Sequence, residues 1–456
     1  MSISADAPAH ETIFAPASGI GRAAICVVRL SGPGTAHALE ALAGALPEPR
    51  RMSLRTLRDP HSGEPLDSAL VVFFPGPASF TGEDMAELHV HGGVATRAGV
   101  LAALSRLPGL RLAEPGEMTR RAFLGGRMDL AEVEGLADLI DAQTRAQARQ
   151  ALRQLSRGGI GARAQAWRER LVAARATIEA AIDFSDEGDV PVDVAAGLGT
   201  EAGAIADAMR AALADGRRGE RLREGFVVVL AGPPNASKST LVNALARRDV
   251  AIVSPIAGTT RDAIEVSCDL GGLPVTLIDT AGLRETQDAV EAIGVARTRA
   301  RIGEADLVVW LDPADAPAPP DPDLAAEGAV LHVRAKADLA GAGAEAGAPA
   351  RDAIALSAAT GEGIDALLAR IEEIARAAMG DGSDALVTRE RHRVALERAA
   401  EALDRARTVL DAAGALPTEL AAEDLRLATR ALESVIGRVD VEDVLDALFA
   451  SFCIGK

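Results

Sequence analysis

One segment near the middle of the chain constrains the fold more than any other. Residues 226–232 (FVVVLAG) are rich in β-branched side chains and predict a strand, and residues 238–247 predict the start of a helix. The loop between them, GPPNASKS (residues 232–239), has the strand–loop–helix setting of a Walker A motif, Gly-x-x-x-x-Gly-Lys-Ser/Thr. Because loop amides and a helix N-terminus favour anionic phosphates, the segment predicts a phosphate site.

The side chains of this loop fit that chemistry, with one departure. Lys238 can reach β- and γ-phosphates, and the Ser239 hydroxyl can bind Mg²⁺. Ser237 stands where the motif has its second glycine. A non-glycine residue at positive φ costs about 1–2 kcal/mol, so we expect backbone strain at Ser237. Alone, this imperfect match does not distinguish a phosphate site from a chance loop.

Further motifs follow in the order that a guanine-nucleotide site requires. AGTTRD (residues 257–262) offers Thr260 as a second Mg²⁺ ligand. VTLIDTAG (residues 275–282) is an apolar strand that ends at Asp279, the second-shell metal position of GTPases. Gly282 is then placed to sense the γ-phosphate. Together with the phosphate loop, these motifs indicate a nucleotide site.

The base-binding end of the site has a second departure. A strand predicted at residues 329–333 leads to AKAD (residues 335–338), where Asp338 can pair with the guanine ring, and LSAAT (residues 356–360) completes the pocket. The usual motif has Asn in the place of Ala335. Truncating a buried polar partner costs about 1–3 kcal/mol. We therefore expect a preference for guanine that persists in weakened form.

Hydrolysis needs a group that positions water, and the usual one is missing. Many small GTPases place a Gln after the DxxG glycine, where this chain has Leu283. No arginine finger is marked by the sequence, but the Asn235 carbonyl suits a monovalent cation that would replace its charge. From the residues alone two alternatives stay open. Asn235 can simply brace the loop, and Glu285 and Glu291 can be solvated helix acids.

The chain separates into regions by the texture of its sequence. Residues 10–125 mix strand-like runs with one helical stretch near 94–107, which predicts an α+β domain. Residues 126–220 and 384–450 have helical periodicity, and residues 225–378 alternate strands and helices as in a parallel sheet. The central block is therefore expected to be inserted into a helical domain. Within it, Pro-, Gly- and Ala-rich loops are predicted at residues 312–323 and 340–350.

Composition excludes several classes of protein. The hydrophobic fraction of 48% supports a buried core and excludes global disorder. No apolar run approaches the roughly 18 residues that span a bilayer, and the N-terminus lacks the basic and apolar regions of a secretory signal. The three cysteines have no metal-ligand spacing. We expect a cytoplasmic, reduced protein with no membrane segment.

The charge of the chain bears on its partners. A formal net charge of −18 argues against nonspecific nucleic-acid binding by the whole surface. Residues 142–168 nevertheless contain no acid, and arginines recur there every four positions at Arg145, Arg149, Arg153 and Arg157. On a helix they form one stripe. This stripe is either a solvated face answered by acids elsewhere or a docking face for RNA or a partner.

Taken together, these motifs resemble those of a known family. GPPNASKSTLVNAL, AGTTRD, DTAGLRETQDAVEAIG and the C-terminal FCIGK closely resemble the bacterial tRNA-modification GTPases of the MnmE (TrmE) family. The resemblance covers nearly the whole chain, including residues 74–93 and 114–142. It implies a multidomain α+β and α/β protein. The implied parts are an N-terminal folate-binding and dimerisation domain (1–125), a discontinuous helical domain (126–222 and 380–456) and an inserted Ras-like P-loop GTPase domain (223–379).

The resemblance implies a role for each nucleotide-site residue. Glu291 falls on the family's water-orienting glutamate and is the preferred catalytic residue, with Lys238 at the phosphates. Ser239 and Thr260 are implied Mg²⁺ ligands. The implied K⁺ ligands are Asn235, Ser254, Ile256 and Thr259. The other implied nucleotide contacts are Ala236, Ser237, Thr240, Pro255, Ala257, Gly258, Asp279, Thr280, Ala281, Gly282, Lys336, Asp338, Ser357 and Ala358.

A second set of residues matches the family's folate contacts. Arg29, Glu87 and Arg127 fall on such positions, Arg127 where Lys is common, and Lys456 matches a contact at the C-terminus. Arg and Lys suit the folate glutamate, and a buried Glu can accept hydrogen bonds from the pterin. The implied cofactor is a one-carbon tetrahydrofolate in its 5,10-methylene or 5-formyl form. Cys453 is either a nucleophile toward the uridine ring or a packed apolar residue.

The implied reaction adds a carboxymethylaminomethyl-type group to C5 of the wobble uridine of tRNA. The folate supplies one carbon and an amine supplies the rest. The family acts as a homodimer that joins an FAD-binding subunit in a heterotetramer, and GTP turnover would drive closure of the G domain.

Two other functions stay open. A ribosome-assembly GTPase of the Era/EngA type shares the G-domain motifs. However, that type predicts a KH-like domain, for which no GXXG loop is present, and it leaves FCIGK unexplained. The third is a nucleotide-binding scaffold that does not hydrolyse GTP, motivated by Ser237 and Ala335.

Overall fold

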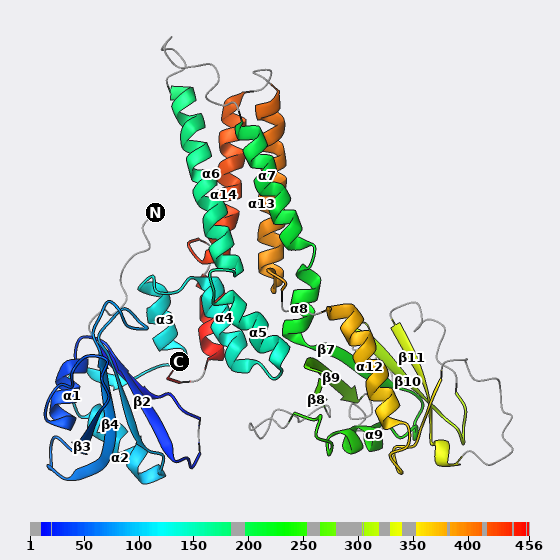
Figure 1. Ribbon diagram of the computed structural model, residues 1–456, viewed down its shortest axis with the longest axis horizontal. Coiled ribbons are helices and arrows are strands. Elements are labelled where there is room, and N and C mark those ends of the chain that lie inside the picture. The colour runs from blue at the N-terminus through cyan, green and yellow to red at the C-terminus, as the bar shows by residue number, and fades with distance from the viewer. Residues whose placement is uncertain are drawn as a thin grey trace, which may run out of the picture. The chain divides into compact units, whose positions relative to one another are not determined.

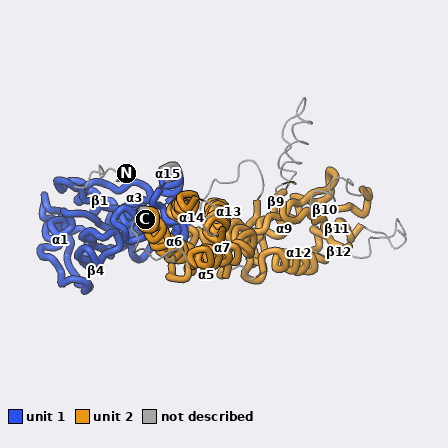
Figure 2. The backbone as a smooth tube through the Cα atoms, turned by 90° about the horizontal axis from the view of Figure 1, so that it is seen from above, with its two compact units in different colours: residues 1–137, 436–456 blue, residues 138–435 orange. Residues whose placement is uncertain are grey.

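The computed structural model divides the chain into two compact units, which are coloured blue and orange in Figure 2. The first comprises residues 1–137 and 436–456, and the second comprises residues 138–435. The residues that the structure describes are 11–19, 21–183, 197–252, 265–279, 303, 305–318, 329–339, 353–380, 384–412, 417–439, 442–452 and 454–455.

The first unit is built on a six-stranded sheet with the order β3-β4-β5-β2-β1-β6. All neighbours are antiparallel except β1 and β6. Alternation along β1 places Phe14 in the core under α1 and α2, whereas Ile13 packs with Met118 of α3 on the other face. The predicted α+β class is confirmed. The elements are β1 (Thr12–Pro16), β2 (Ile25–Ser31), α1 (Thr35–Ala43), β3 (Ser53–Arg58), β4 (Pro65–Phe74), β5 (Met85–His91), α2 (Val94–Ser105), β6 (Leu110–Leu112), α3 (Glu117–Leu124) and α4 (Leu130–Asp141), which runs on into the second unit.

The C-terminal segment packs on this same unit. After α15 (Glu442–Ser451), Ile454 forms a β-bridge with Pro115. Gly455 has φ 96°, and a Cβ there would lie 2.1 Å from the Pro16 carbonyl oxygen. Only glycine allows this approach. Gly455 therefore lies against the end of β1, and Ile454 is paired beside it.

The second unit contains long helices and a second sheet. Helices α7 and α13 pack along one another (Figure 1), and Gly203 of α7 lets the Arg407 side chain of α13 approach closely. Arg168 of α6 pairs with Glu433 of α14 at 2.7 Å. Among the described residues, no helix is both long and apolar enough to cross a membrane. The helices are α5 (Arg145–Gln154), α6 (Ile160–Asp183), α7 (Leu198–Leu213), α8 (Gly216–Glu224), α13 (Glu390–Asp411) and α14 (Thr418–Ile436).

The second sheet has the order β12-β11-β10-β7-β9-β8. Its strands are parallel except for the β8–β9 hairpin, as predicted for the central block. Val228 and Leu230 of β7 lie in one core with Leu241 of α9 and Ile371 of α12. The elements are β7 (Phe226–Ala231), α9 (Lys238–Leu245), β8 (Glu265–Leu270), β9 (Leu273–Asp279), β10 (Leu307–Pro313), β11 (Ala329–Ala335), the 3₁₀ helix η2 (Ala337–Leu339), β12 (Ile354–Leu356) and α12 (Ile364–Met379).

One loop boundary was predicted wrongly. The Pro-rich loop expected from residue 312 begins later, because β10 continues to Pro313, which is paired with Ala335 of β11. Proline is tolerated there because the pairing of β10 with β7 ends at Trp310, so Pro313 has no partner strand on that side among the described residues. The loop expected at residues 340–350 lies outside the described residues.

The glutamines of α5 hold both chain connections between the helices and the second sheet. Gln147 and Gln150 donate to backbone carbonyls of α8 at 3.1 Å, and Gln154 donates to a carbonyl between α12 and α13 at 3.0 Å. Of the predicted arginine stripe, Arg145, Arg149 and Arg153 lie on the same helix, whereas Arg157 lies past its end, in the turn before α6. Arg153 pairs with Asp384. At Arg153 the charge is thus paired with an acid from elsewhere in the fold, as the solvated-face alternative predicts.

Candidate functional site

The phosphate loop connects the central strand β7 to α9. β7 lies between the parallel strands β10 and β9, so the loop leaves the sheet at the carboxyl ends of its strands, where α/β folds bind ligands. Gly232 starts the loop with φ 144°, and a Cβ there would lie 2.5 Å from the Leu311 carbonyl oxygen. The glycine therefore allows the turn to pass against β10.

Two residues of this loop hold left-handed backbone conformations. Asn235 has φ 63°, and Ser237, which precedes the first turn of α9, has φ 69° and ψ 24°. The positive φ predicted for Ser237 is confirmed. Such a conformation costs a non-glycine residue about 1–2 kcal/mol. Ser237 therefore adopts, with strain, the backbone conformation that the motif normally gives to glycine.

Replacing this residue in a Ser237→Gly variant is expected to tighten GDP and GTP binding or leave both unchanged, because glycine adopts this φ without strain. We expect Ala236→Gly to lower the melting temperature instead, since Ala236 is buried and is not at positive φ. Nucleotide Kd and melting temperature of the two variants check this pair. A large loss of affinity in Ser237→Gly would show that the loop has adapted to serine.

Lys238 is held within the phosphate loop. Its ammonium donates to the carbonyls of Gly232 and Pro233 at 2.9 and 2.8 Å, and the residue is 8% exposed. These carbonyls hold the ammonium over the loop, and from this position it can reach a phosphate bound by the loop. Thr240, two residues further along α9, is exposed.

Ser239 in the first turn of α9 contacts Asp279 at the end of β9. The Ser239 hydroxyl donates to Asp279 Oδ2 at 2.6 Å, and Asp279 is fully buried at the end of β9, in register with Leu230 of β7. A hydroxyl and a carboxylate are the hard oxygen donors that Mg²⁺ prefers. The residues present therefore fit a Mg²⁺ ion, with Ser239 as ligand and Asp279 as the group that orients it.

The base-binding motifs follow β11 and β12. Ala335 is fully buried at the end of β11, and Lys336, at φ 57°, turns its ammonium to Asp315 Oδ2 at 2.7 Å. This hydrogen bond holds the pKa of Asp315 below its usual value. Asp338 is exposed on η2. In the turn after β12, Ser357 is buried, and the half-buried Ala358 packs against the core.

Other predicted residues of this site lie outside the part of the chain that the structure describes. In the segment after α9 they are Ser254, Pro255, Ile256, Ala257, Gly258, Thr259 and Thr260, and after β9 they are Thr280, Ala281, Gly282, Leu283, Glu285 and Glu291. At the C-terminus they are Cys453 and Lys456.

The first unit brings together two of the four predicted folate residues, of which Lys456 lies outside the described residues. Arg29 of β2 and Glu87 of β5 are direct cross-strand partners, and Arg29 Nε lies 2.9 Å from Glu87 Oε1. The other carboxylate oxygen lies 3.2 Å from His89 Nε2. Arg127 is exposed, and its side chain runs over Gly82 in the loop before β5. Sequence reasoning missed His89, although strand alternation in ELHVH places it on the same face as Glu87.

Comparison with known proteins finds similarity over nearly the whole chain. The family model described as "MnmE helical domain" matches residues 130–453, and that described as "GTP-binding protein TrmE N-terminus" matches residues 12–127. The tRNA modification GTPase MnmE of Methylorubrum populi is 63% identical over 448 residues, 98% of each chain. The same protein of Methylobacterium sp. is 62% identical over 98% of this chain and 100% of its own length, and that of Beijerinckia indica is 54% identical over 98% and 96%.

Proposed function

Because this chain belongs to the MnmE family of tRNA modification GTPases, we propose that it is activated by K⁺ and modifies C5 of the wobble uridine. The group added is of the carboxymethylaminomethyl type, and one of its carbons comes from a tetrahydrofolate. The single observation that carries the GTPase part is the Ser239–Asp279 hydrogen bond beside Lys238 in the phosphate loop. Because the chain belongs to this family, we no longer consider the ribosome-assembly function.

The phosphate loop supports a Mg²⁺-dependent GTPase. Bound Mg²⁺ would neutralise the charge that develops on the phosphates. Ser239 would bind the metal through its hydroxyl oxygen, Asp279 would fix the direction of that hydroxyl, and Lys238 would hold the β- and γ-phosphates. We further assign the second Mg²⁺ ligand to Thr260 and the orientation of water to Glu291, which both lie outside the described residues.

Potassium activation is supported by the backbone of Asn235. This residue is exposed and left-handed next to the strained Ser237, in the part of the loop that precedes Lys238. An oxygen ligand at this place would hold a monovalent cation beside the phosphates, where many GTPases use an arginine finger. Such a substitute charge is needed because the sequence marks no arginine finger. The other proposed K⁺ ligands are Ser254, Ile256 and Thr259.

With K⁺ as the only monovalent cation, GTP hydrolysis is expected to be several-fold faster than with Na⁺, because the Asn235 site selects the cation that completes the charge around the γ-phosphate. Steady-state phosphate release at matched ionic strength checks this. Equal rates in the two salts would contradict K⁺ activation. Absence of turnover in both, with nucleotide still bound, would favour the scaffold function suggested by Ser237 and Ala335.

The folate site is supported by the Arg29–Glu87–His89 group. Glu87 has two basic partners and a side chain that is 21% exposed, so its carboxylate is fixed in place and still reachable. A fixed carboxylate suits the amino-pyrimidine edge of a pterin, and Arg127 and Lys456 suit the glutamate tail. The C-terminal segment packs on the same unit as these residues. We propose that it carries Lys456 and the candidate nucleophile Cys453 to this site.

The remaining parts of the proposal concern assembly. We propose a homodimer, formed through the domain of residues 1–125, that combines with an FAD-binding subunit in a heterotetramer. The helical domain (126–222 and 380–456) would connect it to the G domain (223–379). The location is proposed to be the cytoplasm, where tRNA is modified.

Mass spectrometry of tRNA nucleosides from a deletion strain tests the function as a whole. Loss of a C5-modified wobble uridine, restored by the intact gene, is the expected result. An unchanged nucleoside profile would overturn the proposed reaction, although the family assignment would stand.

A further inference from the structure

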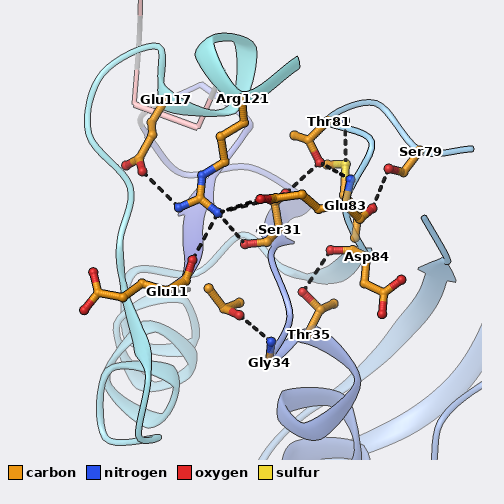
Figure 3. Close-up of polar contacts among 12 residues, drawn as sticks. Glu11, Ser31, Gly34, Thr35, Ser79, Thr81, Glu83, Asp84, Glu117 and Arg121 are labelled. Atoms are coloured by element: carbon orange, nitrogen blue, oxygen red, sulfur yellow. Dashed lines mark hydrogen bonds and ion pairs between the residues drawn. The ribbon is translucent and has the colours of Figure 1, made fainter. Parts of the chain in front are cut away.

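A network of polar side chains surrounds Arg121 of α3 in the first unit (Figure 3). The guanidinium donates to Glu83 Oε2 at 3.1 Å, to Glu117 Oε1 at 3.1 Å and to the Glu11 carbonyl at 3.0 Å. Its side chain is only 14% exposed. Arg121 therefore joins α3, the start of β1 and the loop before β5 with one fork of donors, the geometry for which arginine is suited.

The loop that receives Arg121 is anchored at several points. Glu83 Oε2 also accepts from the Ser31 hydroxyl at 2.6 Å, and that hydroxyl lies 2.7 Å from Thr81 Oγ1. The Thr81 oxygen in turn accepts from the Glu83 amide at 3.2 Å. At the end of the loop, Thr35 of α1 donates to the Asp84 carbonyl at 3.1 Å. The loop of residues 79–84 is thus held by several hydrogen bonds, and Arg121 supplies its charged anchor.

This network adjoins the proposed folate group on the same face of the sheet. Ser31 is paired with Met85, and the next pair on that face is Arg29 with Glu87, because side chains alternate along β2 and β5. The loop also contacts the third folate residue directly. Gly82, at φ 85°, lies under the Arg127 side chain, whose Cγ would be 3.4 Å from a Cβ at that glycine.

We infer that Arg121 is a positioning residue for the one-carbon-folate site. It holds Glu83 directly and Thr81 through Ser31. These residues fix the loop that bears Gly82, and the loop sets where Arg127 stands relative to Arg29 and Glu87. Arg121 does not need to touch the ligand, since its own donors are taken up by Glu83, Glu117 and the Glu11 carbonyl. The inference rests on the proposed function, because it deepens the folate assignment of the same site.

Folate binding by Arg121 variants of the full-length protein tests this, with 5-formyltetrahydrofolate as the probe. Loss of the charged anchor in Arg121→Met is expected to raise its Kd about tenfold, the effect of losing a charge-assisted hydrogen bond. Arg121→Lys is expected to recover part of the affinity, since an ammonium keeps the charge but not the fork. The rate of GTP hydrolysis should stay unchanged in both.

Two further measurements separate positioning from a general loss of stability. Arg106→Met removes an arginine of the same unit that pairs with Asp59, away from the network, and should leave the Kd unchanged. Adding Arg127→Ala to Arg121→Met should raise the Kd less than the two single effects combined, because one acts through the other. If Arg121→Met fails to fold, Glu83→Gln and Arg121→Lys take its place in the cycle.

Additive effects of the Arg121 and Arg127 substitutions, or an unchanged Kd in the Arg121 variants, would overturn the inference while the folate site stood. Failure of the unsubstituted protein to bind 5-formyltetrahydrofolate would instead overturn the folate part of the proposed function, and the inference with it.

Discussion

An Asp279→Asn variant is expected to lose about 10- to 100-fold in GTP hydrolysis at low Mg²⁺, the usual cost of removing a group that orients a metal ligand. Asp279 is fully buried and accepts a hydrogen bond from the Ser239 hydroxyl at 2.6 Å. Its charge therefore holds the hydroxyl in the orientation that directs the oxygen lone pairs to the metal. Asparagine keeps the shape and loses the charge. Raising the Mg²⁺ concentration should therefore recover part of the rate. Turnover measured across a Mg²⁺ titration checks this.

The controls for this prediction come from the same unit. Asp249→Asn changes an exposed carboxylate shortly after α9 and should leave the titration unchanged. Ser239→Ala should show a similar loss, and the double variant should be little worse than either single one, because both substitutions remove one interaction. A rate for Asp279→Asn equal to that of the unsubstituted protein would mean that this carboxylate does not act on the metal.

The parts of the nucleotide site that sequence reasoning predicted are those fixed by local backbone geometry. A Walker loop allows one course between β7 and α9, so the left-handed conformation of Ser237 could be expected from its place in the motif. The strand that ends at Asp279 could likewise be placed, since an apolar run of that length has few alternatives. The contact of Lys336 with Asp315 was not predicted, because it depends on how far β10 continues.

Contacts between distant segments were the ones that sequence reasoning missed. Arg121 meets Glu83 and the Glu11 carbonyl only after α3 has packed on the sheet, and neither partner is marked by a local motif. On α5 the sequence interpretation was based on the regularly spaced arginines. The glutamines between them make the contacts to the neighbouring backbone, because a neutral amide can donate to a buried carbonyl without burying charge.

The Arg29–Glu87 pair shows how resemblance and structure complement each other. The resemblance implied both residues separately, 58 positions apart in the chain. The β2–β5 register makes them direct partners, and His89, two residues along β5 from Glu87, reaches the same carboxylate. Unlike the contacts of Arg121, the place of His89 beside Glu87 could have been predicted from the alternation of side chains along the strand.

Glu87→Ala is expected to abolish the C5-modified nucleoside in cells while the purified protein keeps its GTP turnover. The carboxylate is held by Arg29 at 2.9 Å and His89 at 3.2 Å, so its removal takes away the fixed acceptor for the pterin. It also leaves two basic groups without their common partner, which disfavours repacking around the alanine. The phosphate loop belongs to the other compact unit and shares no residue with this group.

The matched control is Glu40→Ala, which removes an exposed carboxylate from α1 of the same unit and should leave the nucleoside at its normal level. Nucleoside mass spectrometry of complemented deletion strains and phosphate release by the purified variants give the two readouts. Glu87→Gln should fail less completely, because an amide oxygen still accepts a hydrogen bond although the charge is lost. Normal modification in the Glu87→Ala strain would remove the folate role from this residue. Loss of both modification and GTP turnover would show that Glu87 supports the fold as a whole, since a residue confined to the folate site affects only the first.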